Sequence, residues 1–239
     1  MKLKPLFLTT CFTVAIAFCA NATLINPSNN SFEGATASFS FPVTGTVNDS
    51  YGSWNFQLSA VAALSGGVQI GTATALGGGY VPAPQNGTNE VAIKFPVGVV
   101  VDANLSQTLP VAWLPNSTYT LNVYVASSTT AGVLSGSTLA LKSTGGTQAS
   151  QSVLSVANLL TVSNIYQPVT LTYKTGNTAP TGNVGVSLDF PNVLQVAGSV
   201  YVDNVTLTVV PNNVQVATTT GSNGSGGRTM NFSATGGAP

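Results

Sequence analysis

Six carboxylates supply almost all of the chemistry that this chain could carry out. Histidine is absent, and the only cysteines, Cys11 and Cys19, lie within the first 22 residues. Ser-His-Asp and Cys-His arrangements, and metal sites built on histidine, are therefore excluded. Carboxylates alone leave two kinds of site, a pair that cleaves glycosides and a set of oxygen ligands that binds calcium. The six residues are Glu33, Asp49, Glu90, Asp102, Asp189 and Asp203.

Asp203 stands in "VYVDNVTLTVVP" (residues 200–211), a segment with every local sign of a β-strand. Side chains alternate between the two faces of a strand, so Asp203 is expected on the more apolar face, with Val205 and Leu207. A charged carboxylate in that position needs a partner. One interpretation is a calcium ion held jointly with Glu33, if the first and last strands of the domain lie side by side. The other is a position at the rim of a sheet, where Asp203 accepts backbone N–H hydrogen bonds.

No further pair of carboxylates stands out as catalytic. Asp49 and Asp102 lie beside turn residues, where Asp commonly bonds to its own backbone. Glu33 and Asp203 already have a structural explanation as calcium ligands. A GxSxG motif, a phosphate loop and a dinucleotide fingerprint are all absent from the sequence. We therefore expect no enzymatic activity.

Sugar binding requires exposed aromatic faces for stacking, with amide or carboxylate groups nearby to bond to the hydroxyls. Tyr80 is the strongest candidate, because it lies in a loop rich in Gly and Pro, where an aromatic side chain has no core to join. Trp54 and Trp113 are better explained as core residues. The candidate ligand-binding residues are Tyr51, Trp54, Tyr80, Asn86, Asn89 and Glu90.

The first 22 residues have the three parts of a secretory signal peptide. Two lysines precede an apolar run at 5–18, and "ANA" at 20–22 forms a small-x-small cleavage site. That run is too short to span a bilayer comfortably, and no later stretch approaches the ~20 apolar residues required. We therefore expect a secreted or cell-surface protein whose mature chain, 23–239, has no membrane span.

The chain carries few charges, since only 5% of its residues are Asp, Glu, Lys or Arg. After the signal peptide, four basic and six acidic residues give a net charge of −2. Without a basic patch the chain cannot neutralise several phosphates, which excludes nucleic-acid binding. A surface made of Ser, Thr, Asn, Gln and Gly instead favours contacts with sugars or with an extracellular matrix.

Short β-branched and aromatic runs, separated by Gly, Asn, Pro and Ser turns, predict an all-β chain. The only helix candidate is "QSVLSVANLL" at 151–160. Eleven short strands with frequent turns predict a β-sandwich or barrel. The expected strands are 35–43, 53–58, 68–74, 90–94, 98–102, 108–113, 119–126, 138–142, 168–173, 183–190 and 199–209.

Three segments in order resemble the galactose-binding-like jelly roll of carbohydrate-binding modules and of secreted bacterial proteins of the PEP-CTERM class. They are "NPSNNSFE", "LSQTLPVAWLPNSTYTLNVYVASST" and "VYVDNVTLTVVP", and the resemblance spans residues 24–211. It implies one domain, an antiparallel jelly-roll β-sandwich of eight to ten strands, with structural calcium held by Glu33 and Asp203. The chain departs from the pattern in two ways: "SNN" is inserted in the first segment, and the PEP-CTERM anchor is absent.

These observations predict a signal peptide at 1–22, a jelly-roll domain at 23–211 and a tail at 212–239. Gly, Ser, Thr and Asn dominate the tail, which predicts a flexible segment or one that adds a strand to a partner. The function expected is non-catalytic binding of carbohydrate or another extracellular polymer. The alternative is a structural protein whose copies assemble as homo-oligomers, filaments or layers by strand addition.

Overall fold

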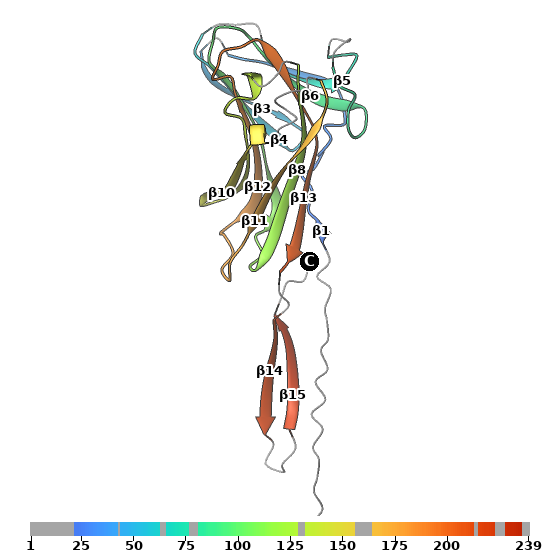
Figure 1. Cartoon of the computed structure of the whole chain (residues 1–239), viewed down its shortest axis with the longest axis vertical. Helices are drawn as coiled ribbons and strands as arrows, with labels where there is room; N and C mark the ends of the chain where they lie inside the picture. The colour runs from blue at the N-terminus through green and yellow to red at the C-terminus, as the bar shows by residue number, and fades with distance from the viewer. Residues whose placement is uncertain are drawn as a thin grey trace, which may run out of the picture.

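A computed structural model shows an all-β chain (Figure 1). The structure describes residues 22–42, 44–62, 66–76, 81–128, 132–155 and 164–212, and the backbone of 215–222 and 228–235. The strands are β1 (Thr23–Leu24), β2 (Ala37–Ser40), β3 (Gly45–Tyr51), β4 (Trp54–Ala60), β5 (Gly67–Thr72), β6 (Asn89–Phe95), β7 (Val101–Ala112), β8 (Ser117–Ser127), β9 (Thr138–Ser143), β10 (Gly146–Ser152), β11 (Gln167–Lys174), β12 (Asn183–Pro191), β13 (Gly198–Pro211), β14 (Gln215–Ser222) and β15 (Arg228–Thr235). Two short 3-10 helices, η1 (Gly132–Leu134) and η2 (Val153–Ser155), complete the described elements.

Two antiparallel sheets pack face to face. The seven-stranded sheet has the order β11-β8-β13-β6-β5-β2, with β1 paired to β13, and the six-stranded sheet has the order β10-β9-β12-β7-β4-β3. Strands that are consecutive in the sequence repeatedly fall in different sheets, as β12 and β13 do. The predicted antiparallel jelly-roll β-sandwich is confirmed.

The core lies between the two sheets and follows from period-two alternation. On β4, Trp54, Phe56 and Leu58 have no exposed surface, whereas Asn55 and Gln57 point to solvent. Every other strand residue can therefore be polar without cost to the core. Many of the inward residues are β-branched or aromatic, the types that fit a pleated surface best.

The strands of the six-stranded sheet that sequence patterns missed are its two edges, β3 and β10. An edge strand pairs on one side only, and both of these carry mostly polar, exposed residues, so neither shows apolar alternation. The helix candidate at 151–160 is wrong at its start, because Gln151 and Ser152 end β10 and Val153–Ser155 form η2. Residues 156–160 lie outside the described part of the chain.

A β-bulge in β13 changes which side chains share a face. Asp203 lies opposite Tyr124 of β8, but Thr206 lies opposite Asn122, so β13 has one residue more than its partner over this interval. Asn204 takes up the extra residue in a left-handed conformation with φ of 48°. The alternation therefore resets, and the predicted placement of Asp203 beside Val205 is wrong.

Beyond β13, β14 and β15 form a separate two-stranded antiparallel sheet, with Gln215 opposite Thr235 and Ser222 opposite Arg228. The predicted limits of the signal peptide, domain and tail remain predictions. Among the described residues, no helix is long and apolar enough to cross a membrane.

Candidate functional site

The outer face of the seven-stranded sheet carries a second group of buried apolar residues, separate from the core. Val91 and Ile93 of β6 point into the core, so the alternate residue Ala92 points outward. Val81 and Tyr124 pack against this group. We call it the outer-face cluster, and it consists of Leu76, Ala92, Ala126, Tyr166 and Tyr201.

Glu90 lies on β6 beside the outer-face cluster and has no exposed surface. The Tyr166 hydroxyl donates a hydrogen bond to its Oε2 atom. Its Oε1 atom is buried and has no hydrogen-bond partner among the described residues. Burial raises the pKa of Glu90 to about 7, the Tyr166 hydrogen bond opposes that rise, and the charge of Asp203 adds to it. A carboxyl group in this position is partly protonated near neutral pH.

Asp203 on β13 is the neighbour of Glu90 on the adjacent strand β6. Val202 of β13 pairs with Val91 of β6, and the two strands are antiparallel. The position after Val202 is Asp203, and it therefore lies opposite the position before Val91, which is Glu90. Asp203 is also fully buried, and burial raises its pKa to about 6. The two carboxyl groups thus lie together under one covering layer, although 113 residues separate them in the chain.

Three backbone N–H groups bind the Asp203 carboxylate. Those of Gln85 and Asn86 donate to Oδ2 at 2.6 and 2.9 Å. That of Asn204 donates to Oδ1 at 2.6 Å. These bonds favour the ionised form and oppose the effect of burial on the pKa. Asp203 therefore fixes the loop before β6 above the sheet through the expected backbone N–H bonds, but it does so from the interior strand β13 and not from a rim.

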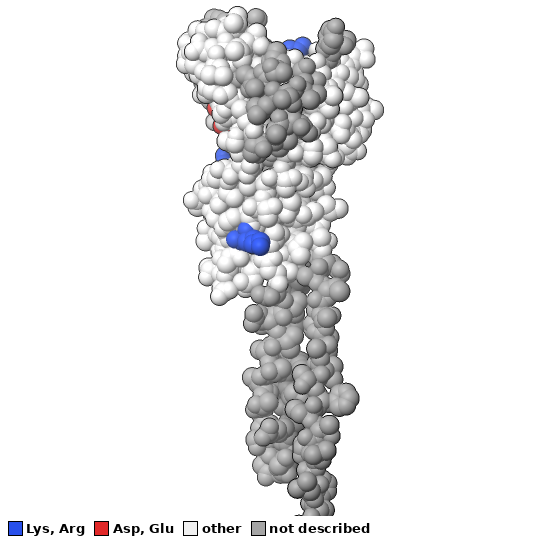
Figure 2. Space-filling view, viewed as in Figure 1, with Lys and Arg blue, Asp and Glu red and all other residues white. Residues whose placement is uncertain are grey.

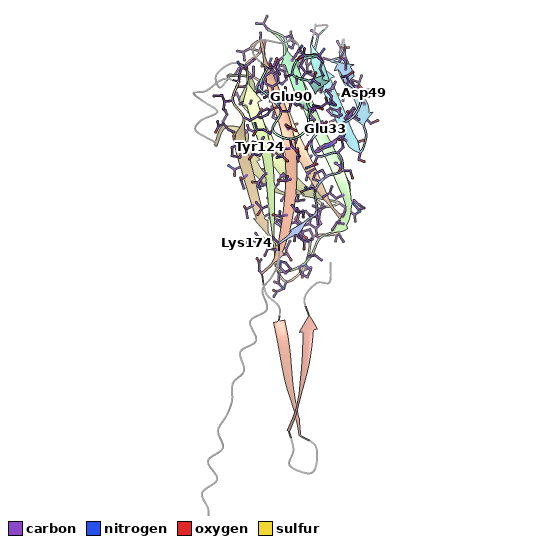
Figure 3. All side chains as sticks on the ribbon, turned by 90° about the vertical axis from the view of Figure 1, so that its right-hand side faces the viewer. Glu33, Asp49, Glu90, Tyr124 and Lys174 are labelled. Atoms are coloured by element: carbon purple, nitrogen blue, oxygen red, sulfur yellow. The ribbon has the colours of Figure 1, made fainter. Side chains whose placement is uncertain are left out.

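Glu33 holds the other end of the same loop. Its Oε1 accepts the N–H groups of Thr88 and Asn89 at 2.8 and 3.0 Å, and its Oε2 accepts the Thr88 hydroxyl at 3.0 Å. Burial alone would raise the pKa of Glu33, but these bonds hold it below the ordinary value. A Cβ atom on Gly87 would lie 2.1 Å from Glu33 Oε1, so only glycine allows this close approach. Figure 3 shows Glu33 and Glu90 in the same part of the sandwich, with Lys174 at the opposite end.

The predicted calcium ligands thus converge on one loop, 85–89. Within the described ranges no group of three or more acidic side chains surrounds a single point. Glu33 Oε2 and Asp203 Oδ1 each accept one hydrogen bond, which leaves each oxygen a lone pair for a hard cation. The donor chemistry therefore fits calcium, and the ion itself stays a prediction.

The predicted sugar-binding aromatics have structural roles instead. Trp54 is fully buried, lies 5.2 Å from the ring of Phe32, and donates its indole N–H to Asn29 O at 3.1 Å. Trp113 is a core residue too, with a ring 4.5 Å from that of Tyr119. Neither tryptophan has a face for a sugar ring.

The other described candidates for sugar binding also form hydrogen bonds within the protein. The Tyr51 hydroxyl is within hydrogen-bonding distance of the Phe32 and Ala35 carbonyl oxygens, at 3.1 and 2.8 Å. The Asn86 side chain donates to Ser31 Oγ at 2.7 Å. Asn89 is buried and donates to Gly34 O at 3.0 Å. Tyr80 lies outside the described residues.

A cavity of about 270 Å³ adjoins the outer-face cluster at Leu76. It lies over the outer side of β2 and β5, so a small molecule there would lie on the same face of the sheet as Glu90. The residues that line it are Thr36, Ala37, Ser38, Gln69, Ile70, Ala75 and Leu76.

A second carboxyl pair, Asp102 and Asp189, lies between β7 and β12. Burial raises the pKa of Asp102 to about 6, and the charge of Asp189 adds to the rise. Asn104 donates its amide to Asp189 Oδ1 at 3.0 Å. Asp102 is the second residue of β7 and Asp49 lies near the end of β3, so both belong to strands close to a turn.

A sequence model of the HpiC1-like family, described as HpiC1 cyclase, matches residues 23–208. The chain belongs to this HpiC1-like cyclase family. The match covers nearly all of the sandwich, including both Glu90 and Asp203. A search of curated proteins gave no match.

Crystal structures of two cyclases share the fold of this family member. The Stig cyclase Fisc from Fischerella sp. TAU, in complex with (3Z)-3-(1-methyl-2-pyrrolidinylidene)-3H-indole, is 20% identical with a TM-score of 0.56, over 81% of this chain and 100% of its own. A cyclase from Fischerella sp. TAU is 22% identical with a TM-score of 0.56, over the same shares of the two chains.

The family match corrects the functional prediction. Non-catalytic carbohydrate binding, assembly as a structural protein, and a polymer as partner were wrong, because the match is to a family of cyclases. The jelly-roll part of the predicted resemblance holds. Sequence patterns gave no reason to pair Glu90 with Asp203, because the pairing of β6 with β13 brings them together. They gave no reason to select Tyr166 either, because it reaches Glu90 from the segment before β11.

Proposed function

We propose that this chain is a cyclase that closes a ring in a small molecule by proton transfer from Glu90. The observation that carries the proposal is a fully buried carboxyl pair on the outer face of a sheet, in which Glu90 keeps an unpartnered Oε1 atom. A buried oxygen without a partner is costly unless a ligand meets it. The family match supports a cyclisation as the reaction.

The two carboxyl groups have different roles in this proposal. Glu90, with a pKa near 7, is the general acid, because a catalytic acid works best when its pKa is close to the operating pH. Asp203 accepts three N–H bonds and acts as the carboxylate that fixes the loop over the site. Glu90 Oε1 gives its proton to a double bond of the substrate, a second π bond or heteroatom of the same molecule attacks the cation, and a proton returns to Glu90. The product is an isomer of the substrate, and no redox partner is required.

Tyrosine rings border the reacting position. Tyr166 and Tyr201 belong to the outer-face cluster, and Tyr124 packs against it. The faces of such rings stabilise a developing cation, which suits a protonated intermediate. Leu76, Ala92 and Ala126 complete the apolar surroundings of this position, which agrees with a largely apolar substrate. Figure 2 shows few charged side chains on the visible face of the molecule. The 3H-indole compound bound to Fisc serves as the first binding probe.

The test combines binding with turnover. The purified chain is titrated calorimetrically with that 3H-indole compound, then incubated in D₂O with small aromatic olefins that carry an internal nucleophile. We expect isomeric cyclic products that contain one deuterium from the acid. Glu90→Gln keeps the shape of the side chain and should retain binding while losing turnover by at least about a hundredfold. Equal turnover in the variant would refute the assignment.

We further propose a structural calcium ion at Glu33 and Asp203, which would hold loop 85–89 in place. An ion that binds only the folded chain raises the melting temperature. We expect calcium to raise it and a chelator to lower it, with the difference lost in Glu33→Gln. The same melting temperature with and without chelator would contradict the site and leave the cyclase proposal intact.

Export is the remaining part of the proposal. If the signal peptide is cleaved after Ala22, protein recovered outside the cytoplasm begins at Thr23. Intact-mass measurement of the secreted protein tests this directly. A chain that retains its first residues inside the cell would contradict it.

A further inference from the structure

One end of the sandwich presents five aliphatic side chains to solvent. They lie after β4, between β6 and β7, and between β12 and β13, at the end opposite Leu24 of β1. We call this surface the apolar pole, and it consists of Val61 (67% exposed), Val97 (68%), Val100 (42%), Val193 (47%) and Leu194 (58%).

The apolar pole is one continuous surface. Ala60 pairs with Val101 across β4 and β7, so the next residues outward, Val61 and Val100, lie beside each other. The loop with Val97 and Val100 is joined to the loop with Val193 by a hydrogen bond from Gly98 N–H to the Gln195 carbonyl oxygen, 2.8 Å long. The five side chains therefore cover a shared end rather than separate points.

Asn192 fixes the two loops rigidly. It is fully buried, and its side-chain amide donates to the carbonyl oxygens of Pro96 and Val196 at 3.1 and 3.0 Å. Its backbone N–H donates to Val101 O at 2.8 Å. The aliphatic side chains are thus held outward without a further loss of backbone entropy when they bind a partner.

The chemistry of the apolar pole indicates its partner. Residues 60–62, 96–101 and 191–197 contain no charged side chain. These three segments together hold 16 residues, fewer than the roughly 20–30 that each side of a standard protein–protein interface uses. A lipid bilayer accepts a small apolar surface without requiring a complementary shape, and aliphatic groups contribute in proportion to the area they bury.

We propose that the apolar pole docks onto a lipid bilayer by inserting these loop side chains among the acyl chains. Attraction to anionic lipid is not needed, since the pole has no charge to attract it. Binding should therefore occur on neutral vesicles and change little with salt. Docking at this end would bring the enzyme to apolar molecules dissolved in the membrane.

Co-sedimentation of the purified full chain with phosphatidylcholine vesicles, at low and high NaCl, tests the proposal. We expect binding at both salt concentrations. Val97→Ser with Leu194→Ser should weaken the partition coefficient at least about tenfold, because each change removes apolar area from the bilayer. The matched control is Leu24→Ser, which changes an equally exposed aliphatic residue (66%) at the other end and should bind as the wild type does.

Three results would overturn the proposal: no sedimentation with vesicles, equal binding by the pole variant, or equal losses in the pole variant and the Leu24 control. Light scattering without vesicles measures the oligomeric state and so tests the alternative partner, a second copy of this chain. If the chain is a dimer that the pole substitutions dissociate, the apolar pole is a contact between copies and the bilayer assignment is wrong. All of these substitutions are at exposed positions, so unchanged melting temperatures confirm that the fold is intact.

Discussion

Asp203 and Val205 are two residues apart on β13, yet they face opposite sides of the seven-stranded sheet. Val205 is a core residue, while Asp203 binds the loop that covers the outer face. The bulge at Asn204 causes this separation. The strand can therefore place a carboxyl group in a functional position and still supply an unbroken apolar row to the core.

The left-handed conformation of Asn204 gives a first prediction. A β-branched residue is strongly disfavoured at a φ of 48°, whereas glycine accepts it. We expect Asn204→Val to lower the free energy of unfolding by about 1–3 kcal/mol in urea titrations. Asn204→Gly is the matched control and should stay within about 1 kcal/mol of the wild type. Equal stability of the two variants would mean that the bulge does not constrain this residue.

A second prediction concerns the anchoring of loop 85–89. Gly87 and Gly45 have similar φ values, 76° and 84°, but a Cβ at Gly87 would collide with Glu33 Oε1, while a Cβ at Gly45 meets nothing within 4 Å. Gly87→Ala should therefore destabilise the protein more than Gly45→Ala does. Hydrogen exchange at the Thr88 and Asn89 amides should accelerate only in the Gly87 variant. Acceleration in both variants would show that backbone strain alone is responsible.

The interior strands of the fold were predictable from the sequence, and the two edges of the six-stranded sheet were not. Strands such as β8 and β12 are buried along one or both faces, so their apolar periodicity is plain. The sequence predicts two strands, 98–102 and 108–113, in place of the single strand β7, because Asn104 and Ser106 interrupt its apolar pattern. Those residues point to the outer face of a sheet that continues through them. A polar outer face and a turn look alike in sequence.

The site was less predictable than the fold, for reasons of topology. Glu90 and Asp203 both stand out in the sequence, but the patterns around them indicate a sugar ligand and a metal ligand respectively. Their proximity depends on the pairing of β6 with β13, which no local pattern encodes. Tyr166 lies just before β11 and reaches Glu90 from a different part of the chain. A bulge of a single residue then reverses the face on which Asp203 is expected.

The raised pKa values predict how stability depends on pH. Glu90 has a pKa of about 7 in the folded chain and 4.5 as its ordinary value. Between these values the unfolded chain loses this proton while the folded chain keeps it, so the free energy of unfolding falls as pH rises from about 4.5 to 7. Asp203 and Asp102 act in the same direction up to about pH 6. Solvent screening keeps the contribution of each group below about 1.4 kcal/mol for every pH unit between its unfolded and folded pKa.

Urea titrations across pH 4.5–8 check this slope. Glu90→Gln cannot ionise, so its stability should fall less over that range than that of the wild type. Asp49→Asn, at an exposed position of the edge strand β3, controls for the loss of a carboxylate as such. A wild-type protein that becomes more stable between pH 5 and 7 would contradict the burial of a protonated Glu90.

The hydrogen bond from Tyr166 to Glu90 predicts a change in the pH dependence of catalysis. The Tyr166 hydroxyl stabilises the ionised Glu90 and thereby lowers its pKa. Tyr166→Phe removes this donor, so the pKa of Glu90 should rise above its wild-type value of about 7. Because the acid must be protonated to react, the loss of activity at high pH should then move to a higher pH.

Two measurements separate this positioning role of Tyr166 from a merely structural one. Turnover as a function of pH reports the change in pKa directly, and ¹³C NMR titration of the Glu90 carboxyl reports it without any substrate. Tyr173→Phe is the matched control, since its hydroxyl binds Gln148 Oε1 at 3.3 Å, away from the site, and its loss should leave the Glu90 titration unchanged. If Tyr166→Phe lowers activity equally at every pH and the carboxyl titrates as before, Tyr166 only supports the packing of the outer-face cluster.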